Sequence, residues 1–119
     1  MLYLFCVAFG GAMGAILRYC VKLILGNTAF PFATLCVNLL GCFLMGLLGG
    51  VSKGANKAFF LVGVLGALTT FSSFGLETVE LFSKGNYGAG IVNILINNIF
   101  GLVLVYIGFR FGNLLIKQI

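Results

Sequence analysis

The chain has 119 residues, of which 61% are hydrophobic and only 8% are charged, and its mean hydropathy is +1.20. This composition is too apolar and too poor in surface charge for a water-soluble domain. The net charge of +5 comes from scattered lysines and arginines, which is typical of membrane-flanking residues and not of nucleic-acid binding. A spanning helix takes about 20 apolar residues. We therefore expect an all-α membrane protein, a single domain of residues 1–119 with spans at about 2–25, 33–51, 59–82 and 87–116.

The sequence offers little support for catalysis or for a metal cluster. Its four cysteines lie inside apolar runs, it has no histidine, and it has two acidic residues. We expect the cysteines to pack as small apolar side chains at helix contacts. Since no nucleophile–base pair or phosphate loop is recognisable, the sequence does not predict an enzyme.

The first expected span carries small residues at helical spacing. Gly10 and Gly14 are four residues apart, as are Gly11 and Ala15, so another backbone can approach closely along that face. Arg18 follows, one or two turns before the end of the span. Two interpretations stay open for Arg18: its side chain snorkels to the lipid headgroups, or it lines an aqueous vestibule.

The second expected span begins near the only proline, Pro31, which is compatible with a first helical turn. Asn38 lies deep in this span between apolar neighbours, and an amide at that depth needs hydrogen-bond partners. Gly41 and Gly46 provide a further small-residue surface. Asn38 therefore either joins two helices or serves a polar pathway.

The third expected span contains the most unusual stretch of the chain, Gly66–Phe74. Thr69, Thr70, Ser72 and Ser73 place four hydroxyls within five positions. Lipid offers these groups no partners, and adjacent threonines and serines weaken a helix. We expect a helix broken near its middle, with the break facing something polar. Freed carbonyls there suit a cation such as sodium, whereas hydroxyls and freed N–H groups suit an anion.

Two aromatic residues are interleaved with these hydroxyls. Phe71 and Phe74 are three residues apart and share one face of any remaining helix. A ring is positive at its edge, so edges directed at a pore attract a small anion, by on the order of 1 kcal/mol per ring. Since desolvating an ion costs far more, hydroxyl groups and the amide of Asn38 must provide most of the compensation.

Further polar residues lie beyond the break. Glu77 and Glu80 follow in the third span, and Asn93, Asn97 and Gly101 are spaced four apart in the fourth. This spacing predicts one polar stripe along one face of the fourth helix.

The basic residues are almost evenly divided between the two sides of a four-span protein. The side with both termini has Lys53, Lys57, Arg110 and Lys117. The opposite side has Arg18, Lys22 and Lys84. Because the lysine and arginine bias of short loops sets orientation, this balance predicts dual topology and an antiparallel dimer. The alternative is a single orientation decided by small local differences.

Three motifs in this order resemble one family. They are Gly10-Gly11-x-x-Gly14-Ala15-x-x-Arg18-Tyr19, the stretch Pro31–Gly46 around Asn38, and Gly66–Glu77. Together they resemble the Fluc (CrcB) fluoride channels over nearly the whole chain. The resemblance implies an antiparallel homodimer with two fluoride pores, each lined by both subunits and surrounded by membrane lipid.

The resemblance also implies roles for individual residues. Asn38 and Ser73 would be hydrogen-bond donors to fluoride, with Phe71 and Phe74 as edge-on contacts. The remaining implied pore residues are Thr70 and Ser72. The backbone carbonyls of Gly66 and Thr69 would hold a structural sodium ion at the dimer axis. Arg18 would lie toward a vestibule, and Glu77 fits the polar pattern of the third span.

The fourth span departs from the family pattern. Many members have a tyrosine and a serine four apart where this chain has Asn93 and Asn97. The polar track at that end of the pore is therefore altered, although amides also donate hydrogen bonds.

The resemblance thus implies passive, fluoride-selective export that lowers cytoplasmic fluoride, across the plasma membrane of a prokaryote (the inner membrane if Gram-negative). The alternative is a small multidrug-type antiporter that exchanges protons for cations. Such a transporter needs a buried carboxylate in its first span, where this chain has none. A non-transporting assembly subunit is a third possibility, but it leaves the hydroxyl-rich break unexplained.

Overall fold

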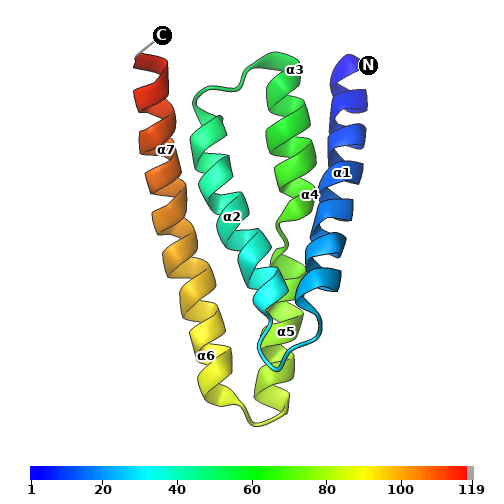
Figure 1. The fold of residues 1–119 in the computed structure, drawn as a ribbon, viewed down its shortest axis with the longest axis vertical. Helices are drawn as coiled ribbons and strands as arrows, with labels where there is room; N and C mark the ends of the chain where they lie inside the picture. The colour runs from blue at the N-terminus through cyan, green and yellow to red at the C-terminus, as the bar shows by residue number, and fades with distance from the viewer. Residues whose placement is uncertain (118–119) are drawn as a thin grey trace.

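The computed structural model describes residues 1–117 and contains four helices long and apolar enough to cross a membrane. They are α1 (Leu2–Leu25), α2 (Phe32–Gly49), the interrupted helix Gly54–Ser83 and the helix Tyr87–Lys117. The four lie side by side, and the start of α1 and the end of the Tyr87–Lys117 helix are at the same end of the bundle (Figure 1). Its longest dimension is 51 Å, against about 40–45 Å for a bilayer with headgroups. The chain is a multi-pass membrane protein, as predicted.

The third helix consists of four segments. These are α3 (Gly54–Lys57), the π-helix η1 (Ala58–Leu65), α4 (Gly66–Leu68) and α5 (Phe71–Ser83). The predicted interruption is present, because Thr69 and Thr70 are extended (ψ 153° and 114°). Figure 1 shows the resulting gap between α4 and α5 in the middle of the bundle.

The start of the third helix differs from the expected boundary near residue 59. The helix begins at Gly54, five residues earlier than expected. Gly54 has φ +55°, a conformation open to glycine that lets the chain turn sharply into the helix. Polarity does not oppose a helix at this end of the span, where water can hydrate the side chains of Asn56 and Lys57.

The expected close approach of a second backbone to α1 is confirmed. A Cβ atom on Gly14 would lie 2.1 Å from the Val64 carbonyl oxygen of η1, and one on Gly10 would lie 2.4 Å from that of Phe59. Gly11 has nothing within 4 Å of such an atom. Gly10 and Gly14 therefore pack closely against the third helix, whereas Gly11 does not.

The fourth helix comprises α6 (Tyr87–Leu95), the π-helix η2 (Ile96–Phe100) and α7 (Gly101–Lys117). Its α7 part packs against α2 through glycines of both helices. A Cβ on Gly46 would lie 2.1 Å from the Val105 carbonyl oxygen, and one on Gly108 equally close to that of Phe43. Close backbone packing of this kind is the usual way in which helices associate in lipid.

The buried apolar core is small. It is centred on Val37, Leu65 and Leu68, where α2 meets the middle of the third helix. Most other large apolar side chains are exposed on the single chain, as expected for a surface that faces lipid or another subunit. The core thus lies beside the interruption.

Candidate functional site

The break is stabilised locally by the hydroxyls that predicted it. Thr70 caps α5, since its Oγ1 accepts a hydrogen bond from the Ser73 N–H at 3.2 Å. The Thr70 hydroxyl in turn donates to Ser73 Oγ at 3.1 Å. Thr69 Oγ1 donates back to the Leu65 carbonyl at 2.9 Å. The Thr70 hydroxyl therefore replaces the backbone acceptor that the Ser73 N–H would have in an unbroken helix.

Asn38 of α2 holds the extended backbone at Thr70 from both sides. The Thr70 N–H donates to Asn38 Oδ1 at 2.8 Å, and Asn38 Nδ2 donates to the Thr70 carbonyl at 3.2 Å. The side chain thus acts as a short strand would, pairing with one N–H and one C=O. Asn38 joins two helices and at the same time maintains the break.

Two backbone carbonyls lose their helical donors at the break. In a continuous helix the Thr70 N–H would donate to the Gly66 carbonyl, and the Ser73 N–H to that of Thr69. Here these N–H groups donate to Asn38 and to the Thr70 hydroxyl. The oxygens of Gly66 and Thr69 are therefore left available, and backbone carbonyls at helix interruptions are suitable sodium ligands. This donor set fits the expected sodium ion.

Donors are also left available at the start of α5. Within the described residues, the N–H groups of Phe71 and Ser72 have no protein acceptor. The Ser73 hydroxyl accepts from Thr70, so its own proton stays available. Free N–H groups at a helix N-terminus favour negative charge. The same interruption thus offers oxygens on one side and donors on the other.

The two aromatic rings lie together beside the break. Phe71 and Phe74 have ring centroids 5.4 Å apart and an interplanar angle of 55°. Phe74 is 7% exposed, whereas Phe71 is 80% exposed on the single chain. Both line a groove of about 260 Å³, together with Asn38, Asn97 and Thr70. The phenylalanine pair therefore forms one wall of an open groove.

A chain of hydrogen bonds connects the fourth helix to this groove. Asn38 Nδ2 also donates to Asn97 Oδ1 at 3.0 Å. Asn97 Nδ2 donates to both the Oδ1 and the carbonyl of Asn93, each at 3.0 Å. Asn93 Nδ2 donates to Thr78 Oγ1 at 2.9 Å, and that hydroxyl donates to the Phe74 carbonyl at 2.7 Å. Asn93 and Asn97 therefore share one helix face, as predicted.

The same amides explain the π-helical segment η2. Asn97 and Asn98 each donate from the side chain to the carbonyl four residues earlier. In a regular helix that carbonyl accepts the residue's own backbone N–H, so the side chains compete with the backbone. A wider turn relieves the competition. Sequence analysis predicted the polar stripe but not this change of helix type.

Arg18 and Glu77 lie at a second cavity, which is also lined by Thr70. This cavity of about 340 Å³ is also lined by Tyr19, Thr34 and Ser73. Thr34 Oγ1 donates to Glu77 Oε1 at 2.8 Å. The buried second oxygen, Oε2, has no partner among the described residues.

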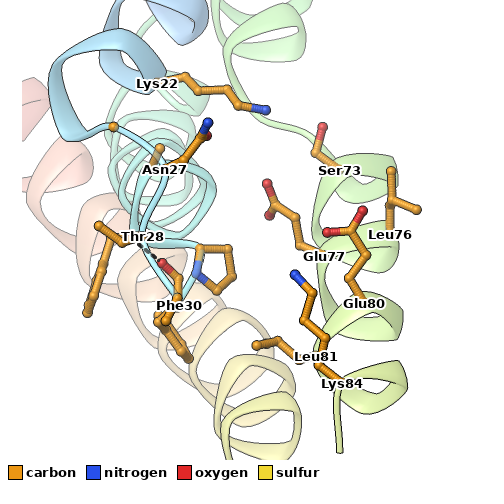
Figure 2. A pocket seen from close by; sticks show the side chains of 15 residues that line it. Lys22, Asn27, Thr28, Phe30, Ser73, Leu76, Glu77, Glu80, Leu81 and Lys84 are labelled. Carbon is orange, nitrogen blue, oxygen red and sulfur yellow. Dashed lines mark hydrogen bonds between the residues drawn. The ribbon is translucent and has the colours of Figure 1, made fainter. Parts of the chain in front are cut away.

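A third cavity of about 320 Å³ opens beside the α1–α2 turn and shares Ser73 and Glu77 with the second. In Figure 2, Glu77 and Glu80 project from α5 toward this space, and Lys22 reaches across it from the end of α1. Lys84 lies below the two acids. A polar space of mixed charge therefore leads from the end of the bundle toward Ser73.

The structure thus gathers most of the predicted site residues around one interruption. Asn38, Thr70, Ser73, Phe71 and Phe74 meet there, and the exposed Ser72 has its hydroxyl 3.3 Å from that of Thr70. Sequence analysis missed Thr34 and Thr78. A single threonine in a helix has no distinctive signal, because its hydroxyl can bond the carbonyl of its own preceding turn.

Comparison with known proteins identifies the family. The family model described as "CrcB-like protein, Camphor Resistance (CrcB)" matches residues 5–109. The chain belongs to the CrcB family. A relative from Dehalococcoides mccartyi is 45% identical, covering 92% of this chain and 91% of the relative. One from Azobacteroides pseudotrichonymphae is 43% identical (89% and 92%), and one from Parabacteroides distasonis is 36% identical (100% and 99%). Each of these CrcB relatives is named "Fluoride-specific ion channel FluC".

Proposed function

We propose that this chain forms a passive, fluoride-selective ion channel that exports fluoride and catalyses no reaction. The observation that carries the proposal is the interrupted third helix, whose hydroxyls and free N–H groups lie at mid-span beside Phe71. Names of relatives that match over nearly the whole chain support fluoride as the ion.

The free donors and the aromatic edges together suit a small anion. The N–H groups of Phe71 and Ser72 and the Ser73 hydroxyl supply hydrogen bonds, and the rings of Phe71 and Phe74 add their positive edges. Fluoride is the smallest halide and accepts hydrogen bonds strongly. Fixed donors at short range therefore compensate its lost hydration better than they compensate a larger ion. Asn38 and Thr70 hold these donors in position.

The pore is formed by an antiparallel homodimer with dual topology. The groove beside the break is open, and Phe71 is 80% exposed on one chain, so a second copy is needed to enclose an ion there. The near balance of basic residues on the two sides favours insertion both ways. An oppositely inserted copy brings an equivalent break to the same depth.

A structural sodium ion stabilises the pairing at the dimer axis. Each copy supplies the carbonyl oxygens of Gly66 and Thr69, which have lost their helical donors. Two copies together offer four such oxygens. When bound, the cation neutralises the partial negative charge of carbonyls that would otherwise face each other without hydration.

The polar cavities form the approach to the pore. Arg18 and Glu77 line a vestibule that adjoins Ser73. Asn97 lies at the groove beside Asn38, and Asn93 lies behind it. The channel resides in the plasma membrane of a prokaryote, the inner membrane if the cell is Gram-negative. Fluoride that enters as neutral HF and dissociates inside is driven out by the membrane potential.

The antiporter alternative is less well supported. Both acidic residues lie on α5 and α1 has none, so no carboxylate is available in the first span. Of these two acids, Glu77 accepts a hydrogen bond from the Thr34 hydroxyl through its Oε1 atom.

Efflux from liposomes tests the proposed function. Vesicles that carry the purified protein and a potassium ionophore are loaded with either fluoride or chloride, and ion-selective electrodes follow their release. We expect fluoride to leave while chloride is retained. Equal release of both ions would contradict selectivity, and proton-coupled cation uptake would favour the antiporter.

A further inference from the structure

We infer that Asn93 and Thr78 are positioning residues that hold Asn38 on the break through Asn97, and that Asn93 and Asn97 are not themselves ion ligands. The part of this inference that concerns conduction rests on the proposed function. The structural part is that these residues keep Asn38 hydrogen-bonded to the Thr70 backbone, and it can be tested whichever ion the protein conducts.

The side-chain N–H groups of Asn38 and Asn97 donate their hydrogen bonds within the protein. Asn38 Nδ2 gives one hydrogen to the Thr70 carbonyl and the other to Asn97. Asn97 Nδ2 gives both of its hydrogens to Asn93. An amide with both hydrogens committed has none left for an anion unless an existing bond breaks. Asn97 therefore presents an oriented acceptor to Asn38, and not a donor to the groove.

Burial supports the same conclusion for Asn93 and Thr78, which lie at the far end of this series of hydrogen bonds. Asn93 is 1% exposed and Thr78 is 5% exposed, so neither side chain reaches the groove. Asn93 Nδ2 is fixed by Thr78 Oγ1, which is anchored on the Phe74 carbonyl. This arrangement leaves Asn93 Oδ1 directed at Asn97.

The series of hydrogen bonds therefore begins within α5 and returns to Thr70, the residue that caps α5. It leads from the Phe74 carbonyl through Thr78, Asn93 and Asn97 to Asn38, and from there to the Thr70 N–H. Because the bonds are in series, loss of one leaves the next amide without its orientation. Loosening Thr78 should then loosen the backbone at Thr70, although the two residues make no direct contact in the hydrogen-bond chain.

Amide hydrogen exchange at Thr70, measured by NMR on the full chain in lipid nanodiscs, tests the structural part. We expect the Thr78→Val and Asn97→Ala variants to lower protection of the Thr70 N–H about tenfold. Thr78→Ser retains the hydroxyl and should keep the protection. Ser83→Ala is the matched control, since it removes an exposed hydroxyl of α5 that bonds only the Val79 carbonyl. Unchanged Thr70 exchange in a folded Thr78→Val variant would overturn the inference.

Fluoride efflux from liposomes tests the functional part. Thr78→Val should lower the rate about tenfold, Thr78→Ser should restore it, and Ser83→Ala should leave it unchanged. In an Asn97→Ala background, adding Thr78→Val should lower the rate no further, because both changes break the same chain. Independent, multiplying losses would overturn the series arrangement. Altered Thr70 exchange in a protein that releases no fluoride would keep the positioning role and contradict the proposed ion instead.

Discussion

At the scale of single residues, the two phenylalanines beside the break differ in a way that allows their roles to be separated. Phe71 is exposed on the single chain and Phe74 is buried. Replacing Phe71 with Ile should lower fluoride efflux about fivefold, since a ring-edge contact is worth on the order of 1 kcal/mol, while the thermal stability stays near that of the native protein. Phe74→Ile should lower both efflux and thermal stability. Native efflux from both variants would exclude an aromatic role in conduction.

The residues that were predictable from sequence are those whose presence in lipid needs an explanation. Four hydroxyls within five positions of an apolar span would lack hydrogen-bond partners in a simple membrane anchor. Thr69, Thr70, Ser72 and Ser73 therefore predicted the break. Thr34 and Thr78 were not predictable. Their importance comes from the partners that the fold brings to them, Glu77 and Asn93, which are 43 and 15 residues away in the chain.

At the scale of helices, glycines set the distance between α2 and α7. A methyl group at Gly46 would lie 2.1 Å from the Val105 carbonyl oxygen, whereas one at Gly49 would meet nothing within 4 Å. We expect Gly46→Ala to destabilise the protein by about 1–3 kcal/mol through overpacking. Gly49→Ala, on the same helix, should leave stability unchanged or raise it slightly. Thermal unfolding in detergent measures both, and equal stability of the two variants would contradict the packing described.

The carbonyls at the end of α4 lead to a prediction about cations. If sodium occupies the Gly66 and Thr69 oxygens, replacing all sodium with N-methyl-D-glucamine should abolish most fluoride efflux, because that large cation cannot enter a carbonyl site. The measurement is electrode-detected release from the same liposome preparation in the two solutions. Detergent release of the trapped fluoride serves as the control for loading. Identical rates in sodium-free solution would show that the channel needs no sodium.

The helices themselves were largely predictable, because long apolar runs and short polar turns define spans. Their internal irregularities were only partly predictable. The hydroxyl cluster identified the gap at Thr69 and Thr70, but no pattern identified the π-helices η1 and η2. In η2, the widening follows from the competition of the Asn97 and Asn98 side chains for backbone carbonyls. This competition depends on side-chain conformations that apolar periodicity does not specify.

At the scale of the whole molecule, the balance of basic residues should allow both orientations in the membrane. A reporter at the C-terminus of the native chain should be detected on both sides in comparable amounts. Removing Lys22 and Lys84 by substitution with Gln leaves only Arg18 on that side, against four basic residues on the other. This variant should insert one way, with its termini in the cytoplasm. A native chain that inserts in one orientation would contradict dual topology.

The central claim is that two interrupted third helices form a path for fluoride and not for larger halides. Planar-bilayer recording with fluoride on one side and chloride on the other tests it most directly, because a single reversal potential reports conduction and selectivity together. We predict a steady current whose reversal potential is displaced far from zero in the direction set by fluoride selectivity. A current that reverses near zero, or no current from correctly assembled protein, would contradict the account.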